Sequence, residues 1–273
     1  MSMNWGVGFH TPTGGCVDES AYEQYIGRWS RLFVPAVLAA AEIGTGDRVL
    51  DVATGSGEAA KMAVTAVGDS GLVIGADISA AMLATAYARL SDRPFRAVVT
   101  DGQALAFRDG SFDGVLCQLG LMFFPDPPRG LAEFRRVLRP GRCAAVCVIS
   151  SGDRAPMWGI LARTLSRFLP DQVTILNLSF ALADAAQLES MFRAAGFRDI
   201  RVSKEAREAV VDSFDEFWAP IEAGTGQMPQ AYLALPETSR RAVRDEVYGC
   251  LSKFESNGRY RMSVEMLVGV GRA

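Results

Sequence analysis

The chain has 273 residues, 49% of them hydrophobic, which is enough for one large domain with a well-buried core. Its 28 basic and 31 acidic residues give a formal net charge of −3, so no overall basic charge favours a nucleic acid or an anionic membrane as partner. Five cysteines without CxxC spacing indicate neither a disulfide framework nor a metal site.

The first segment, MSMNWGVGFHTPTGG, lacks a basic stretch followed by an apolar one, and no later stretch stays apolar long enough to cross a bilayer. We therefore expect a cytoplasmic protein without a membrane partner. Residues 19–42 have the pattern of one or two amphipathic helices, with Pro35 where a second helix could begin. Residues 1–45 are thus predicted to form an N-terminal helical cap.

From residue 46 onward, short apolar runs alternate with helical segments. The predicted strands are 48–53, 72–77, 95–100, 112–118 and 143–150, and the predicted helices are 57–67, 79–91 and 128–138. Apolar runs without polar alternation are typical of strands buried on both faces. The pattern therefore predicts an α/β protein with a Rossmann-like, doubly wound and mostly parallel sheet.

Beyond residue 150 the alternation loosens. Predicted helices cover 155–169, 184–195 and 237–254, the last after a stretch at 219–239 interrupted by Gly and Pro, and predicted strands cover 199–211 and 260–273. The two strands would pair as an antiparallel hairpin at the edge of a seven-stranded sheet. We interpret 46–150 as a cofactor-binding core, 154–183 and 212–257 as helical lid insertions, and 1–273 as a single domain.

Ligands in open α/β sheets bind beyond the carboxyl ends of the strands. Four polar residues follow the apolar runs there: Asp51, Asp77, Asp101 and Gln118. Gly55 and Gly57 would let the backbone approach a ligand, and the helix that follows them offers amide donors. Asp77 suits two ribose hydroxyls, although it could instead cap the next helix. Asp101 suits an exocyclic amine, although it could be a turn residue.

Together these residues describe a pocket for a nucleoside with a small charged tail. A nicotinamide dinucleotide stays possible by spacing, because Gly55 to Ala60 fit the small-residue variant of G-x-G-x-x-G/A. A short-chain reductase would need a Tyr-x-x-x-Lys pair, and none of Lys61, Lys204 and Lys253 has a tyrosine four residues before it. A dehydrogenase is therefore the weakest of the hypotheses.

The segments VLDVATGSGE, VIGADISAAML and TDGQALAFRDGSFDGVLCQLGLMFFPDPPRGLAEFRRVLRPG resemble, in order and spacing, successive motifs of class I S-adenosylmethionine-dependent methyltransferases. The resemblance covers residues 20–150 and is strongest to the ubiquinone/menaquinone methyltransferase-like branch. One departure is the PGG turn of the family, which reads Pro140-Gly141-Arg142 here. We expect this change to leave the cofactor site intact.

The resemblance implies S-adenosyl-L-methionine as cofactor. The residues implied to contact it are Tyr22, Arg28, Asp51, Ala53, Thr54, Gly55, Ser56, Gly57, Asp77, Ile78, Met82, Asp101, Gly102, Gln103, Gln118 and Leu119. Asp51 and the loop after it would surround the methionine moiety, Asp77 would bind the ribose, and Asp101 would take the adenine amine. Arg28 would belong to a helix that closes over the cofactor, although it could equally form a surface ion pair.

The remaining contacts follow from the same resemblance. Ile78 and Met82 would flank the adenine, and Gly102 and Gln103 would lie beside its amine. Gln118 and Leu119 would face the amino group and the sulfonium of the cofactor.

Aromatic and apolar side chains after the fourth strand and in the two insertions favour a small, largely apolar or aromatic acceptor of small-molecule or secondary metabolism. The residues predicted to contact it are Met122, Phe123, Trp158, Phe180 and Trp218. Side chains at such helical spacing are also usual in a core. The arginines of the 237–254 segment are expected to form a solvated helix face rather than a nucleic-acid site.

Methyl transfer from a sulfonium is an in-line displacement, so alignment of the reactants can lower much of the barrier and a general base is optional. The only histidine, His10, lies in a Gly/Thr/Pro-rich leader where we expect it to be exposed, so no catalytic residue is assigned. The alternative hypothesis is a protein of the same fold that binds S-adenosylmethionine and acts as a cyclase or binding module without methyl transfer.

Overall fold

The structure is a computed structural model that describes residues 19–224 and 226–273. These residues form two compact units, each described here by itself. Unit 2 comprises Ser30–Ile149, Leu182–Glu205 and Met266–Ala273, and unit 1 comprises the described residues up to Trp29, Ser150–Ala181 and Ala206–Glu265. The expectation of a single domain stays a prediction.

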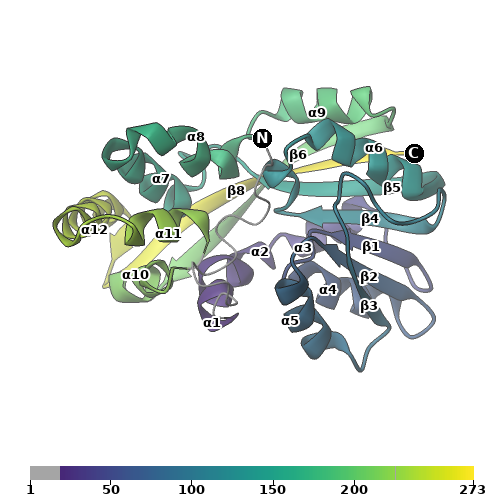
Figure 1. Cartoon of the computed structure of the whole chain (residues 1–273), viewed down its shortest axis with the longest axis horizontal. Helices are drawn as coiled ribbons and strands as arrows, with labels where there is room; N and C mark the ends of the chain where they lie inside the picture. The colour runs from purple at the N-terminus through teal and green to yellow at the C-terminus, as the bar shows by residue number, and fades with distance from the viewer. Residues whose placement is uncertain (1–18, 225) are drawn as a thin grey trace. The chain divides into compact units, whose positions relative to one another are not determined.

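A mixed sheet is the centre of the fold (Figure 1). Its strands are β1 (Arg48–Val52), β2 (Leu72–Asp77), β3 (Phe95–Val99), β4 (Phe112–Gln118), β5 (Leu138–Ile149), β6 (Arg198–Val211), β7 (Glu255–Ser256) and β8 (Arg259–Arg272). The order is β3-β2-β1-β4-β5-β8-β6, with the short β7 paired to β8. Strands β1 to β5 are parallel and β8 is antiparallel to β5, which confirms the predicted fold class.

The central strands are buried on both faces, as their unbroken apolar runs predict. Val49 and Leu50 of β1 are both fully buried although their side chains point to opposite faces. In the register, Leu50 lies between Ile74 of β2 and Val115 of β4, so apolar side chains continue across the sheet. The burial requires helices on both faces, which is why the sheet is doubly wound.

Helices of unit 2 cover this sheet. They are α3 (Val34–Ala40), α4 (Glu58–Val67), α5 (Ala80–Leu90), α6 (Pro127–Val137), α9 (Ala185–Ala194) and the 3-10 turn η2 (Leu121–Phe123). α4 packs on β1 and β2, α5 on β2 and β3, and α6 on β5 and α9 (Figure 1). Pro35 lies in the first turn of α3, as predicted. Asp126 caps α6 by accepting a hydrogen bond from Arg129 N at 3.1 Å.

Unit 1 is largely helical. Its elements are α1 (Glu19–Tyr22), the π-helical turn η1 (Glu23–Gly27), most of α2 (Arg28–Ser30 overall), α7 (Pro156–Phe168), η3 (Pro170–Gln172), α8 (Val173–Leu176), η4 (Leu178–Phe180), α10 (Phe214–Glu222), α11 (Gln227–Leu233), α12 (Glu237–Leu251) and η5 (Ser252–Phe254). α7 packs on α11 and α12, and α10 on α11. The region 212–257 was predicted to be helical, but α10 and α11 were not predicted individually, because Pro220 lies inside α10 and Gly226, with φ 90°, is the N-cap of α11.

Strand β5 begins at Leu138, earlier than predicted, and includes Gly141 with φ 79°. Arg142 follows it and donates from Nε to the carbonyl oxygen of Asp113 at 2.6 Å, and its Nη2 lies 2.5 Å from Asp47. These partners are at the amino ends of β4 and β1. The arginine that replaces the family's glycine therefore lies at the amino ends of the strands, opposite the carboxyl ends where a cofactor is expected.

No described helix is long and apolar enough to cross a membrane. Cys117, Cys143, Cys147 and Cys250 are free thiols. Among the described residues, His, Cys, Asp and Glu side chains do not gather into a group of three that could hold a metal ion. His10 and Cys16 lie outside the described residues.

Candidate active site

The strand order changes direction between β1 and β4, and such a switch point opens a crevice at the carboxyl ends of the two strands. The residue directly after each strand has a left-handed backbone, with φ 57° at Ala53 and 54° at Leu119. A non-glycine residue in this region costs roughly 1–2 kcal/mol. A Cβ placed on Gly120 would lie 2.4 Å from the Cβ of Ala53, so glycine is required where the two loops meet. Strained backbone thus lies on both sides of the switch point.

Asp51 is the polar residue closest to this crevice on β1, and it is fully buried. Its Oδ2 accepts a hydrogen bond from Thr54 Oγ1 at 2.7 Å, whereas its Oδ1 has no hydrogen-bond partner among the described residues. Burial, with a smaller contribution from nearby Asp77, raises the pKa of Asp51 from 3.8 to about 7, against the opposite effects of the Thr54 hydroxyl and the Ala60 amide. The carboxylate is kept in a costly state that a positively charged ligand would relieve.

The loop after β1 is supported from outside the crevice. Gly57 has φ 89°, and a Cβ there would lie 3.2 Å from the Cβ of Ala86 in α5, so this glycine serves helix packing as well as the turn. Arg89 donates to the carbonyl oxygen of Ser56 at 3.1 Å and pairs with Glu58 at 2.5 Å. Sequence reasoning missed Arg89 and Glu58. An acidic residue in the first turn of a helix was the available signal for Glu58.

Asp77, at the end of β2, has both carboxylate oxygens bonded to backbone amides. Oδ2 accepts from Gly55 N and Oδ1 accepts from Ser79 N, each at 2.9 Å. The cap of α5 is Ser79 itself, whose Oγ accepts from Met82 N at 3.3 Å. Asp77 therefore fixes the glycine loop against the start of α5. A carboxylate can accept about four hydrogen bonds, so these two contacts are compatible with the predicted ribose contact.

Asp101 and its neighbours form a tight turn after β3. Asp101 Oδ1 accepts from Gln103 N at 2.7 Å, while Gln103 Oε1 accepts from Asp126 N at 2.6 Å. A Cβ on Gly102 would lie 2.4 Å from the ring of Phe124, so Gly102 makes room for this ring. The structure thus gives Gly102 and Gln103 roles inside the protein, and their predicted contacts with a cofactor stay predictions.

Gln118, the last residue of β4, is 8% exposed. Its Nε2 donates to the carbonyl oxygen and the Oγ of Ser30, each at 3.2 Å, and these bonds fix the orientation of the amide. Its Oε1 is buried and has no hydrogen-bond partner in the described part of the chain. The same holds for Ser56 Oγ in the loop after β1.

Two apolar side chains near Asp77 are accessible to the planar ring of a ligand. Ile78 is 37% exposed, and Met82 is partly buried one turn into α5. Both lie in unit 2, together with the loops after β1, β3 and β4.

Tyr22 and Arg28 belong to unit 1, and their contact with a cofactor stays a prediction. The guanidinium of Arg28 pairs with Glu216 of α10 and lies 4.2 Å from the ring centroid of Trp29. The ion pair that the sequence analysis weighed for Arg28 is therefore present.

The predicted acceptor residues are divided between the two units. Met122 and Phe123 are in unit 2, where Met122 is 2% exposed and Phe123 is partly exposed. Trp158, Phe180 and Trp218 are in unit 1, and both tryptophans are 2% exposed. A core role thus accounts for Trp218 by itself, whereas Trp158 Nε1 is buried without a hydrogen-bond partner among the described residues. The role of both tryptophans in acceptor binding stays a prediction.

Trp218 belongs to a polar cluster of unit 1. Its Nε1 donates to Glu222 Oε1 at 2.7 Å, and Tyr232 Oη donates to the same oxygen at 2.8 Å. Burial and the adjacent Glu222 raise the pKa of Tyr232 to about 12, so the phenol stays a donor. Each buried donor in this cluster has a partner.

At the ends of β1 and β4 in unit 2, unlike in this cluster, three acceptor atoms are buried without a partner among the described residues: Asp51 Oδ1, Ser56 Oγ and Gln118 Oε1. They come from the end of β1, the loop after it, and the end of the adjacent β4. Single unpartnered polar atoms also occur elsewhere, such as Trp158 Nε1 in unit 1. Buried polar atoms are ordinarily hydrogen-bonded, so a set of three at a switch point is typical of a site that a ligand completes. This set of acceptors fits an ammonium group, which donates up to three hydrogen bonds. The α-amino group of S-adenosyl-L-methionine is such a group.

Comparison with known proteins agrees with this chemistry. A family profile described as "Methyltransferase domain" matches residues 50–145. The ubiquinone/menaquinone biosynthesis C-methyltransferase of Xylella fastidiosa is 33% identical over 188 residues, which is 63% of this chain and 73% of that protein. The demethylmenaquinone methyltransferase of Renibacterium salmoninarum is 38% identical over 144 residues, which is 52% of this chain and only 56% of that protein.

A solved structure of phosphoethanolamine N-methyltransferase 2 of Haemonchus contortus, in complex with S-adenosyl-L-methionine, superposes with a TM-score of 0.58 at 19% identity. The superposition covers 93% of this chain and 56% of that one. At this identity the likeness concerns the fold alone.

The fold, the strand-end residues and the sequence matches define a class I S-adenosylmethionine-dependent methyltransferase, with S-adenosyl-L-methionine as its cofactor. Within this class the chain belongs to the ubiquinone/menaquinone methyltransferase-like branch.

Proposed function

We propose that the protein transfers the methyl group of S-adenosyl-L-methionine to a small, largely apolar or aromatic acceptor, and that the residues at the ends of β1, β2 and β4 bind the cofactor. The three buried, unpartnered acceptor atoms of Asp51, Ser56 and Gln118 carry the proposal. They would accept hydrogen bonds from the cofactor's ammonium group, and Asp77 would accept those of the ribose. The cytoplasmic location inferred from the sequence is part of the same proposal.

The bound cofactor supplies an electrophilic methyl group on a sulfonium. The protein contributes positioning, because an in-line displacement depends on the alignment of nucleophile, methyl and sulfur, and orientation alone can supply effective molarities of ~10^5 M or more. Asp51 and Gln118 would hold the amino-acid end, and the left-handed backbone at Ala53 and Leu119 would set the course of the two loops around it. The fixed backbone of these loops means that little reorganisation is needed on binding.

Asp77 gives the most direct test of the cofactor site. Calorimetry with S-adenosyl-L-methionine and its demethylated product should show that Asp77→Ala weakens binding by about tenfold or more, since charge-assisted hydrogen bonds are worth roughly 1.5–3 kcal/mol. Asp77→Asn retains one oxygen acceptor and should fall between Asp77→Ala and the wild type. The exposed Asp92, at the end of α5, provides the control Asp92→Ala, which should bind normally. Equal affinity of Asp77→Ala and wild type would refute the ribose contact.

The acceptor is proposed from the apolar surface beside the site and from the relatives. η2 places the partly exposed Phe123 shortly after β4, in the same unit as the cofactor residues. The names of the two relatives refer to quinone biosynthesis, so a reduced naphthoquinone ring is the first acceptor to test.

Incubation with methyl-labelled cofactor should move label into an organic-extractable product and release S-adenosylhomocysteine. Label in protein or RNA instead would contradict a small acceptor. Cofactor binding without any release of S-adenosylhomocysteine, across a panel of quinols, phenols and small amines, would favour the cyclase or binding-module alternative.

A further inference from the structure

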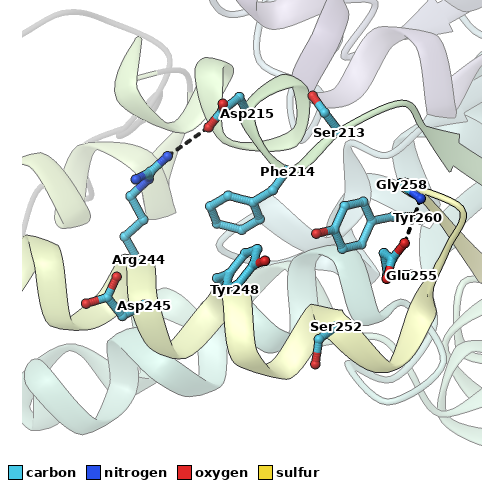
Figure 2. Close-up of a pocket in the computed structure, with 10 residues that line it drawn as sticks. All are labelled: Ser213, Phe214, Asp215, Arg244, Asp245, Tyr248, Ser252, Glu255, Gly258 and Tyr260. Carbon is cyan, nitrogen blue, oxygen red and sulfur yellow. Dashed lines mark hydrogen bonds and ion pairs between the residues drawn. The ribbon is translucent and has the colours of Figure 1, made fainter.

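Unit 1 contains a cavity of about 550 Å³ that none of the predicted cofactor or acceptor residues lines. It is formed by the start of α10, one side of α12 and the β7–β8 hairpin (Figure 2). All the lining residues belong to the segment 213–260 of unit 1, so the cavity is defined within one unit.

Aromatic rings form one part of the wall. Figure 2 shows Phe214, Tyr248 and Tyr260 facing the same space. The rings of Phe214 and Tyr248 meet edge to face, with centroids 4.9 Å apart and an interplanar angle of 82°. Tyr248 is 52% exposed, so much of its ring surface is accessible to a ligand, whereas Tyr260 is 5% exposed and fixed in place. Such ring surfaces attract cations through their negative faces.

The charged side chains of the wall are mostly acidic. They are the carboxylates of Asp215, Asp245 and Glu255 and one guanidinium, that of Arg244. Arg244 already has two partners. Its Nη2 donates to Asp215 Oδ1 at 2.8 Å, and its guanidinium lies 5.3 Å from the ring centroid of Phe214. This contact shows that the same wall already holds one cation between a ring and a carboxylate.

Two carboxylates are left without a positive partner. Glu255 Oε1 accepts from the backbone amide of Gly258 at 2.6 Å, which orients the side chain without neutralising its charge. Within the described ranges, Asp245 has neither a hydrogen bond nor an ion pair. Burial, and after it the nearby Tyr248, Glu255 and Asp215, raise the pKa of Tyr260, in keeping with a negative potential at this wall.

We propose that this cavity binds a small alkylated ammonium ion, with its charge on the side of Glu255 and its alkyl groups against the exposed ring of Tyr248. An inorganic cation would not use the rings, and an anion would be repelled by the carboxylates. A neutral apolar ligand would leave the two carboxylates without a counter-charge. The site is independent of the proposed methyl transfer, because no residue is shared with it.

The test compares choline with its neutral carbon isostere, 3,3-dimethylbutan-1-ol. Ligand-observed NMR titrations are made on the full chain saturated with S-adenosylhomocysteine, so that the cofactor site cannot capture either probe. Choline should bind saturably in the millimolar range, and the isostere should bind at least about fivefold more weakly, because only the cation gains from rings and carboxylates.

Two variants test whether choline binds in this cavity. Tyr248→Leu keeps an apolar side chain but removes the ring, and Glu255→Gln removes the charge; each should weaken choline binding at least about threefold. Both side chains are exposed, so thermal melting should confirm an unchanged fold. Tyr87→Leu is the matched control, because Tyr87 is a tyrosine of α5 with 50% exposure, close to that of Tyr248, and it should leave choline binding unchanged.

Equal affinities for choline and the isostere would overturn the proposal in favour of a non-specific apolar pocket. Unchanged choline binding in both Tyr248→Leu and Glu255→Gln would overturn it as well, and so would the absence of saturable binding to the wild type. Binding of S-adenosylhomocysteine is measured in each variant. A loss of choline binding with normal affinity for S-adenosylhomocysteine separates this site from the proposed cofactor site.

Discussion

Buried polar groups are treated in opposite ways in two regions of this protein. At the ends of β1 and β4 in unit 2, Asp51 Oδ1, Ser56 Oγ and Gln118 Oε1 are buried without partners. In unit 1, the indole of Trp218 and the phenol of Tyr232 both donate to one oxygen of Glu222. The second region resembles an ordinary structural cluster, in which donors and acceptors satisfy one another.

The difference indicates that the two regions have different roles, one in ligand binding and the other in the stability of the fold. A buried acceptor without a partner costs roughly 1–3 kcal/mol, and a buried carboxylate costs more. Such a cost is retained where a ligand recovers it on binding, as at active sites that reduce stability. Substitutions that remove a polar group should therefore stabilise the free protein in the first region and destabilise it in the second.

Among the substitutions considered, Asp51→Asn should have the largest effect on the stability of the free protein and on cofactor binding. The folded-state pKa of Asp51, about 7, lies above its ordinary value of 3.8, so between these values the folded protein binds more protons than the unfolded chain. The stability of the free protein should fall as pH rises from about 4 to 7, by an amount on the order of a few kcal/mol, and then level off. Asp51→Asn should lack this slope and melt at a higher temperature than the wild type at pH 8.

The same substitution should weaken the binding of S-adenosyl-L-methionine by about 10- to 100-fold at pH 8, because a charge-assisted hydrogen bond to the ammonium group is lost. Thermal melts across pH and calorimetry measure the two effects. Asp113→Asn is the control of opposite sign, since hydrogen bonds from the Arg48 amide and Arg139 hold the pKa of Asp113 low in spite of burial. A variant at Asp51 that loses both stability and binding would contradict the contrast between the two regions.

Gly57→Ala should have the next largest effect and tests the scaffold of the first region. The backbone at Gly57 has φ 89°, and an alanine Cβ would lie 3.2 Å from that of Ala86. We expect a loss of roughly 1–3 kcal/mol in the free energy of unfolding, measured by denaturant titration. Gly141→Ala, at a φ of 79° with nothing within 4 Å of the added Cβ, separates backbone strain from the contact with α5. Equal losses in both variants would show that the contact contributes nothing.

Much of unit 2 could be predicted because its signals are local. The strand β2 has the predicted limits, and Asp77, Asp101 and Gln118 follow their strands as expected, since apolar runs and strand-end residues are read directly from the chain. The partners of these residues were not predictable. The orientation of Gln118 depends on Ser30, which is 88 residues away in sequence.

Unit 1 was predicted less well for a different reason. Pro220 and Gly226 were interpreted as breaks, although packing of α10 on α11 stabilises both helices around them. The β7–β8 hairpin was missed despite its signal. Asn257 and Gly258 have φ of 53° and 80°, the conformation that an Asn-Gly pair favours in a tight hairpin.

Tyr232→Phe should have the smallest effect and addresses the second region. The change removes only the phenolic donor to Glu222, and the T-shaped contact of the ring with Trp218, at 5.2 Å between centroids, is retained. Because Glu222 is exposed and keeps the hydrogen bond from Trp218, water can replace the lost donor. We expect a loss of about 1 kcal/mol in the free energy of unfolding.

A double-mutant cycle of Tyr232→Phe with Glu222→Gln separates the contribution of the Glu222 charge to the hydrogen bond with Tyr232, and denaturant titrations supply the four free energies. Gln retains an oxygen that can accept from both Trp218 and Tyr232, so the coupling measures what the charge of Glu222 adds. The affinity for S-adenosyl-L-methionine should stay unchanged in all four proteins. A gain in stability in Tyr232→Phe, like the gain expected for Asp51→Asn, would mean that the cluster in unit 1 is also held in a costly state and would place it among the candidate ligand sites.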